Sequence, residues 1–147
     1  MDYSKLAKMH LDVTVDNKIA LATINLPEKR NALGDGLHDA LEEFLHLVNY
    51  DHDVNAVVLT GNPEGRAFCS GGDVASMNAV NTGENVRDPG YMLRGARYLI
   101  QRFLNCEVPL IAAINGHAVG LGCTIALMCD VTFMSDAARL GDNHTRV

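Results

Sequence analysis

The stretch from Ile111 to Met128 has the residue types that place backbone N–H groups around a ligand. An apolar run ends at Ile114, glycines stand at 120 and 122, and a second apolar run ends at Met128. This pattern predicts a strand, a glycine loop and the start of a helix. The first N–H groups of a helix have no intrahelical acceptor, and the helix dipole favours negative charge there. Such a loop can hold a phosphate or a developing oxyanion, or it can be a tight turn whose glycines serve packing alone.

A second loop of the same design lies earlier in the chain. Residues 66–74 read RAFCSGGDV, an apolar approach followed by small residues, a glycine pair and Asp73. Asp is a favourable helix N-cap, so the sequence predicts that a short helix begins at Val74. Ser70 is not expected to be a nucleophile, because no G-x-S-x-G motif surrounds it and no base is identifiable. Two such loops could each direct one N–H group at a single oxygen, as an oxyanion hole requires.

Four segments, taken together and in this order, resemble the enoyl-CoA hydratase/isomerase family, also called the crotonase superfamily. They are PEKRNAL at 27–33, VVLTG at 57–61, AFCSGGDV at 67–74, and PLIAAINGHAVGLGC followed by CD within 109–130. The resemblance implies an α/β fold of the crotonase-like ββα spiral type. It also implies the binding of an acyl-CoA thioester, whose enolate is held by two backbone N–H groups.

The resemblance implies roles for individual residues. The first oxyanion donor would be the N–H of Gly72, and the second would be the N–H of Leu121. Asp73 would cap the short helix that follows it. In this family the segment with Lys29 and Arg30 lies against the CoA nucleotide, so one of them would contact phosphate; without the resemblance, both read as a solvated loop. The full set of implied substrate-binding residues is Lys29, Arg30, Ala32, Ser70, Gly71, Asp73, Val74, Gly120 and Thr124.

Neither of the two glutamates that serve as general acid and base in hydratases of this family is present. The resemblance places their positions at Thr124 and His144. A hydroxyl group cannot replace a carboxylate base. His144 could act as a base near pH 7, but GDNHTRV (141–147) is also typical of a segment between a strand and a helix. Two functions therefore stay open: an acyl-CoA enzyme whose reaction is unspecified, and a catalytically silent acyl-CoA-binding or subunit-interaction chain.

The resemblance further implies that residues 1–147 are the N-terminal part of a crotonase-like domain, whose C-terminal helical part is absent. That absent part drives the assembly of the family into trimers or dimers of trimers, so a homo-oligomer is implied. We expect apolar faces of helices and sheet to be exposed in this chain, since the segments that cover them are missing. The isolated chain should therefore be oligomeric or poorly soluble.

Hydrophobic periodicity predicts the elements that carry the two loops. A β-hairpin with its turn at Asp16-Asn17 is expected from 11–26, and a helix from Asp35 to Asn49. Further strands are expected at Ala56–Thr60, Leu110–Asn115, Val131–Ser135 and Ala138–Leu140. A helix over Tyr91–Asn105 should have an apolar face of Leu93, Ala96, Ile100, Phe103 and Leu104. The polar stretch Val80–Pro89 is expected to be a mobile loop, the alternative being a lid beside the site. The order of elements predicts an α/β chain with right-handed crossovers.

Composition and charge exclude several classes of protein. The 147 residues are 48% hydrophobic, which suits one domain with a substantial core. A net charge of −6 argues against a nucleic-acid partner, which requires a basic face. The four cysteines form no C-x-x-C motif and are expected to be reduced. The spacing of the histidines predicts no metal site. No cofactor is expected other than the CoA that is part of the substrate. No targeting signal or membrane-spanning stretch is evident, so a cytoplasmic protein without a membrane partner is expected.

Overall fold

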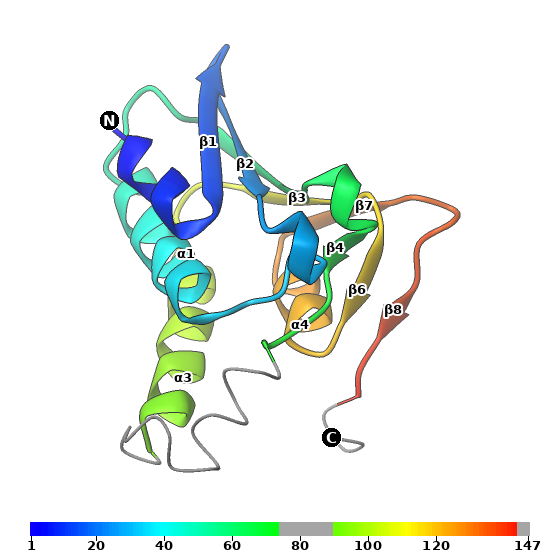
Figure 1. Ribbon diagram of the computed structural model, residues 1–147. Coiled ribbons are helices and arrows are strands. Elements are labelled where there is room, and N and C mark those ends of the chain that lie inside the picture. Colours follow the sequence, from blue (N-terminus) through cyan, green and yellow to red (C-terminus); the bar gives the residue numbers. More distant parts are fainter. Residues whose placement is uncertain (74–89, 144–147) are drawn as a thin grey trace.

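The protein contains two β-sheets, one of five strands and one of three. The computed structural model describes residues 1–73 and 90–143. The larger sheet has the strand order β1-β2-β3-β5-β7 and the smaller one β4-β6-β8, so from β3 onward successive strands alternate between the sheets (Figure 1). The strands are β1 (Leu11–Asp16), β2 (Ile19–Ile24), β3 (Ala56–Gly61), β4 (Ala67–Cys69), β5 (Leu110–Ile114), β6 (His117–Val119), β7 (Val131–Met134) and β8 (Leu140–Gly141). The helices are η1 (Ser4–Met9), η2 (Pro27–Lys29), α1 (Asp35–Val48), η3 (Pro63–Gly65), α3 (Gly90–Leu104) and α4 (Leu121–Leu127). Pairs of strands followed by a helix form the ββα spiral that the resemblance implies.

The β-hairpin is confirmed, but its turn lies one residue later than predicted. Strands β1 and β2 pair antiparallel, and Asp16 is still within the ladder, opposite Ile19. The turn residues are Asn17 and Lys18, with φ angles of 46° and 63°. Two-residue hairpin turns of type I′ require a positive φ at both positions, and asparagine is one of the residues that adopt it most readily. The placement of the turn at Asp16-Asn17 was therefore wrong.

The long helices form as predicted, with two differences in the apolar face of α3: Leu99, which was not predicted, belongs to it, and Leu104 does not. Leu99 and Phe103 are buried, whereas Leu104 is 72% exposed. Leu99 and Phe103 are four residues apart and therefore lie on one side of the helix, where α3 contacts α1. Leu104 is the last residue of α3 and lies off this side, so its inclusion in the apolar face was wrong. Of the other expected positions, Ala96 and Ile100 are half-buried, and the side chain of Leu93 lies outside the described residues.

Two short strands of the small sheet differ from the prediction. Strand β6 was not predicted, because three residues are too few to show a periodicity. Its pairing with β4 and β8 defines it as a strand. The last strand is Leu140–Gly141 rather than Ala138–Leu140, and Ala138 is instead buried in the turn before it. The predicted loop at Val80–Pro89 lies outside the described residues.

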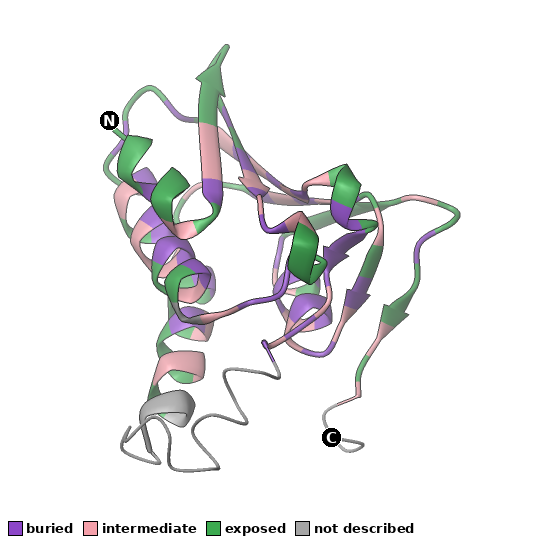
Figure 2. Ribbon diagram, in the orientation of Figure 1, coloured by how far each residue is buried: buried purple, intermediate pink, exposed green. Residues whose placement is uncertain are grey.

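The core lies between α1 and one face of the large sheet (Figure 2). Amphipathic spacing places one face of α1 inside, and each residue of that face is at most 2% exposed: Leu37, Leu41, Phe44, Leu45 and Val48. These side chains form one cluster with inward-facing residues of the sheet such as Ala22, Ile24, Val57 and Ala112. The core is thus on the side of the sheet that carries η1, α1 and α3.

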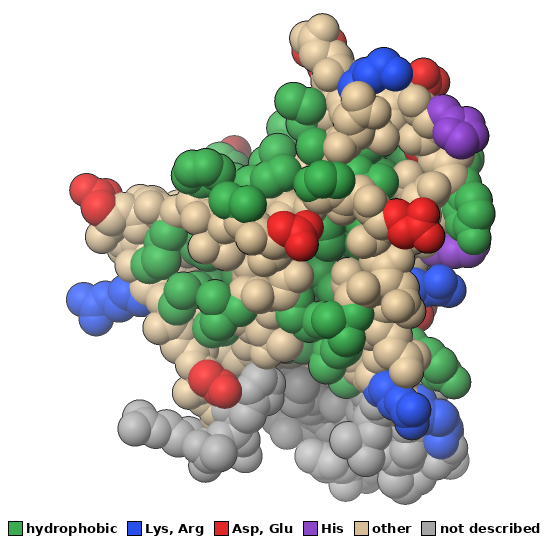
Figure 3. All heavy atoms as spheres, turned by 180° about the vertical axis from the view of Figure 1, so that it is seen from behind, with side chains coloured by type: hydrophobic (Ala, Val, Ile, Leu, Met, Phe, Trp, Pro, Cys, Tyr) green, Lys and Arg blue, Asp and Glu red, His purple; other side chains and the backbone are tan. Residues whose placement is uncertain are grey.

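The opposite face of the large sheet is apolar and open. The register of the strands places Leu21, Val58, Ile111 and Val131 in one row across it. Leu21 and Val131 are 41% and 47% exposed, and Phe133 on β7 is 66% exposed. Seen from behind, the molecule shows hydrophobic side chains spread over its surface (Figure 3). The expected exposure of an apolar sheet face is therefore observed. Separately, no helix in the described part of the chain has the length and apolarity to cross a membrane.

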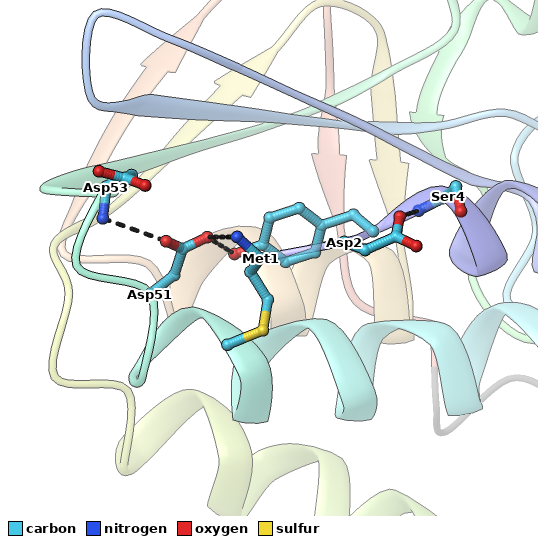
Figure 4. A network of polar contacts seen from close by, with 6 residues as sticks. Met1, Asp2, Ser4, Asp51 and Asp53 are labelled. Atoms are coloured by element: carbon cyan, nitrogen blue, oxygen red, sulfur yellow. Dashed lines mark hydrogen bonds and ion pairs between the residues drawn. The ribbon is translucent and has the colours of Figure 1, made fainter.

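A buried carboxylate ties the start of the chain to the loop after α1 (Figure 4). Asp51 is 7% exposed and accepts hydrogen bonds from the Tyr3 hydroxyl, at 2.7 Å, and from the Asp53 N–H, at 3.1 Å. The ammonium group of Met1 lies 3.4 Å from the same carboxylate. Burial alone would raise the pKa of Asp51, but these hydrogen bonds and the positive charge outweigh it and hold the pKa below its usual value.

We expect Tyr3→Phe to lower the free energy of unfolding by about 2 kcal/mol at pH 7, because the hydroxyl donates to a charged acceptor. A lowered pKa means that Asp51 stabilises the fold above its unfolded pKa, near 3.8, and that this contribution is lost as the pH falls through its folded pKa. Urea unfolding at pH 7 and at about pH 3 should therefore show a smaller effect of the substitution in acid. Tyr50→Phe, at a tyrosine that is 64% exposed, is the control. An equal effect at both pH values would contradict the assignment.

Candidate functional site

The two glycine loops, far apart in the sequence, are in direct contact. A Cβ atom on Gly122 would overlap the carbonyl oxygen of Cys69 and would lie 2.8 Å from its carbonyl carbon. A Cβ atom on Gly71 would lie 2.8 Å from the carbonyl oxygen of Val119 and 3.7 Å from the amide nitrogen of Leu121. Gly71 also has a φ of 99°, which side chains rarely adopt. Glycines at these positions allow the loop after β4 to pack against the start of α4.

The N–H group of Gly72 points away from Leu33, the residue to which Gly72 is bridged. Leu33 and Gly72 form a parallel bridge, in which the Leu33 N–H donates to Gly71 at 2.7 Å and the Asp73 N–H donates to Leu33 at 3.1 Å. In such a bridge the N–H of the bridged residue points to the opposite side. Among the described residues, neither the Gly72 N–H nor the Leu121 N–H has a hydrogen-bond acceptor. The structure thus brings together two adjacent loops, each with a backbone N–H that has no acceptor within residues 1–73 and 90–143.

Helix α4 begins at Leu121, directly after Gly120, whose φ is 54°. The hydroxyl of Thr124 donates to the Gly120 carbonyl at 3.3 Å, and the Thr124 N–H donates to the same oxygen at 3.0 Å. Thr124 therefore uses its hydroxyl within its own helix. The side chain of Asn143, which sequence reasoning missed, lies beside Gly120: a Cβ atom there would be 2.8 Å from its Oδ1. His144 and Val74 lie outside the described residues.

Lys29 and Asp73 form an ion pair at the edge of the site. The Nζ to Oδ2 distance is 2.6 Å, and the side chains are 49% and 10% exposed. The hydrogen bond to Asp73 raises the pKa of Lys29, which stays protonated near neutral pH. The predicted capping role of Asp73 concerns a helix outside the described residues. Arg30 is exposed and, within the described chain, forms no ion pair.

Ser70 is held by the chain segment that contains Lys29 and Arg30. Its N–H donates to the Arg30 carbonyl at 3.2 Å, and its hydroxyl donates to the Lys29 carbonyl at 3.3 Å. Ala32 is buried in the same segment. A serine hydroxyl that donates to a backbone carbonyl does not have the geometry of a nucleophile activated by a base.

All four cysteines are free, and Cys69, Cys123 and Cys129 are buried. The side chain of Cys69 packs against the glycine loop that follows it: the Gly71 N–H donates to its Sγ at 3.5 Å. Burial raises the pKa of the Cys69 thiol to about 12, so the reactive thiolate is scarce at neutral pH. In the part of the chain that the structure describes, no group of three or more His, Cys, Asp or Glu side chains could hold a metal ion.

Comparison with known proteins finds one family over most of the chain. The family model described as enoyl-CoA hydratase/isomerase matches residues 14–147. A Mycobacterium tuberculosis protein named "Probable enoyl-CoA hydratase EchA14" is 39% identical over 131 residues, and the short-chain-enoyl-CoA hydratase of Clostridium acetobutylicum is 36% identical over 126 residues. These alignments cover 86% of this chain but 47% and 46% of the two relatives. The chain therefore spans about half the length of the relatives it matches.

Solved structures agree with the sequence comparisons. An enoyl-CoA hydratase/isomerase from Mycobacterium paratuberculosis superposes with a TM-score of 0.85 at 31% identity, covering 94% of this chain and 54% of that one. The enoyl-CoA hydratase EchA8_6 of Mycobacterium marinum gives a TM-score of 0.81 at 38% identity, covering 92% of this chain and 62% of that one. The arrangement of the two sheets and their helices is thus shared with experimentally determined structures.

Proposed function

Because this chain belongs to the enoyl-CoA hydratase/isomerase family, we propose that it binds an acyl-CoA thioester and stabilises its enolate with the N–H groups of Gly72 and Leu121. The observation that carries this proposal is the contact between the loop at Gly71 and the start of α4, which sets two available donors side by side.

The proposed chemistry follows from where the charge develops. When the Cα–H bond of a thioester breaks, or when a nucleophile adds to its conjugated double bond, the electron pair moves onto the thioester oxygen. Donors that are already in place stabilise this charge without reorganisation, and removing one from such a site typically costs about 3–4 kcal/mol of transition-state stabilisation. Two observations support this assignment: Gly72 is bridged to Leu33, and Leu121 is the first residue of α4.

The reaction itself depends on a general acid or base. Thr124 donates its hydroxyl to Gly120 and is not suited to the role of a carboxylate. We therefore propose that the reaction is isomerisation, thioester hydrolysis or decarboxylation rather than hydration by a pair of glutamates. His144 is the candidate base for such a reaction. The same observation on Thr124 supports a second candidate function, a catalytically silent chain that binds acyl-CoA.

The test is to incubate the purified chain with enoyl-, 3-hydroxyacyl- and saturated acyl-CoAs and to follow each by chromatography with mass spectrometry. A gain or loss of water, a shifted double bond or a released thiol would identify the reaction. Unchanged thioesters that nevertheless bind would favour the silent chain. A folded chain that neither binds nor converts any thioester would overturn the proposal.

We propose that Arg30, rather than Lys29, contacts a CoA phosphate, since the Lys29 ammonium pairs with Asp73. Arg30→Ala should weaken CoA binding about five-fold, equivalent to about 1 kcal/mol. Calorimetry at about 0.1 M and 1 M salt should show the loss shrinking at the higher ionic strength.

Arg66→Ala is the matched control for this measurement. Arg30 and Arg66 are both exposed, and both follow a 3-10 turn that begins with proline, with φ angles of 54° and 52°. An equal loss in the two variants, or none in either, would contradict the assignment to Arg30.

A further inference from the structure

We infer that Asn31 is a positioning residue for the Gly72 N–H; this inference rests on the proposed function. Asn31 is 0% exposed, and its carboxamide makes three hydrogen bonds to the backbone. Its Oδ1 accepts from the Leu26 N–H at 3.1 Å, and its Nδ2 donates to the carbonyls of Asn62, at 3.0 Å, and Ala67, at 2.7 Å. One buried side chain thus joins η2 to the end of β3 and the start of β4.

Asn31 also determines the course of the backbone that follows. Arg30 and Asn31 have φ angles of 54° and 56°, two successive left-handed residues that turn the chain sharply after η2. Asparagine is among the few non-glycine residues that adopt this conformation readily. The turn directs residues 32 and 33 toward the glycine loop.

The segment that contains Asn31 is hydrogen-bonded to the glycine loop after β4. Ser70 donates its N–H to the Arg30 carbonyl, and Leu33 exchanges hydrogen bonds with Gly71 and Asp73. These bonds lie immediately on either side of Gly72 and set the direction of its N–H. A displacement of Leu33 would therefore displace the donor, and Leu33 lies only two residues after the buried carboxamide.

The space around the carboxamide is closed. A Cβ atom on Gly65 would lie 3.0 Å from Nδ2 of Asn31 and 3.2 Å from the Cα atom of Pro27. The last residue of η3, Gly65, therefore packs closely against the carboxamide. Gly65→Ala gives an independent way to displace Asn31 without removing any of its groups.

The test uses variants that separate positioning from stability. Asn31→Gly removes the carboxamide and keeps the left-handed backbone, which glycine adopts freely. Asn49→Ala is the control: Asn49 donates to Asn105 at 3.0 Å and accepts from Glu107 at 2.9 Å, and it follows the last turn of α1, outside the segments that form the site. It also loses two side-chain hydrogen bonds to the backbone, although Asn49 is half-buried and Asn31 is fully buried. Gly65→Ala, which keeps every hydrogen-bonding group of Asn31, covers this difference in burial.

Backbone NMR spectra of the ¹⁵N-labelled chain, recorded at a temperature where both variants are folded, should show the Gly72 amide resonance shifted in Asn31→Gly and unchanged in Asn49→Ala. In the same samples, affinity for butyryl-CoA should fall about ten-fold in Asn31→Gly, because a misdirected Gly72 N–H loses its hydrogen bond to the thioester oxygen. Affinity should change less than about two-fold in Asn49→Ala, where no group near the thioester moves. Gly65→Ala should displace the same resonance in the same way.

A Gly72 resonance in Asn31→Gly that matches the parent chain would overturn the inference, whatever the stability of the variant. Equal loss of affinity in Asn31→Gly and Asn49→Ala would also overturn it. If the parent chain neither binds nor converts any acyl-CoA of the panel, the proposed function fails, but the unliganded Gly72 resonance still decides whether Asn31 positions that amide.

Discussion

Gly122→Ala should lower the free energy of unfolding by about 2–3 kcal/mol, although alanine favours a helix more than glycine does. The added methyl group would overlap the carbonyl oxygen of Cys69. That oxygen belongs to the backbone of β4, so no rotation of a side chain can relieve the contact. Either α4 or the loop after β4 must shift, and both carry a proposed donor. The same substitution should therefore weaken the binding of acyl-CoA as well as the fold.

Urea unfolding monitored by circular dichroism measures the first effect. Gly36→Ala is a closely matched control, since Gly36 is the second residue of α1 as Gly122 is the second residue of α4. A Cβ atom on Gly36 would come no closer than 3.9 Å to Met9. The control should be stabilised by about 0.5–1 kcal/mol from helix propensity alone. Equal stability changes at the two glycines would show that α4 does not pack on Cys69 as described.

The sequence was informative where the signal was local or repeated. The spacing of Leu37, Leu41, Phe44 and Leu45 predicted α1 to within one residue, because a buried helix face requires this period. The continuous apolar run at 56–60 predicted a central parallel strand for the same kind of reason. The resemblance implied a ββα spiral, but the alternation of strands between two sheets was not predicted, since no local pattern indicates which sheet a strand joins.

The close approach of the two glycine loops was predictable from the sequence, whereas the side-chain contacts around them were not. Glycine pairs mark places where two segments approach closely, so the loops at Gly71 and Gly122 were evident from sequence. The pairing of Lys29 with Asp73 joins residues that are 44 positions apart, and only the fold brings them together. Asn31 was missed for a related reason: a buried asparagine is identified by the backbone groups around it, and these come from η2, β3 and β4. Its place in PEKRNAL, next to two cations, was the one available signal.

Leu121→Pro should abolish most of any turnover that the acyl-CoA panel reveals, with an expected loss of about 10²–10³-fold, while the chain stays folded. Proline has no N–H group, so the substitution deletes one proposed donor. Leu121 is the first residue of α4, and this is the helix position that tolerates proline best, because the N–H there has no intrahelical acceptor. The variant therefore removes a hydrogen-bond donor at little cost to the helix. Gly72→Pro should have a similar effect on turnover, but it lies between residues of the Leu33 bridge and needs a separate check of folding.

Leu121→Ala is the matched control, because it removes the same side chain and keeps the N–H. Its rate should stay within about three-fold of the parent chain, since the proposed contact is made by the backbone. Where the chain binds but does not convert thioesters, infrared spectra of butyryl-CoA labelled with ¹³C at the carbonyl give the same comparison. Hydrogen bonds to a carbonyl lower its stretching frequency, so the bound thioester should absorb at lower frequency in the parent chain and in Leu121→Ala than in Leu121→Pro. A rate and a carbonyl frequency that are unaffected by proline would remove Leu121 from the site, and would leave the contact between the two loops as a feature of packing alone.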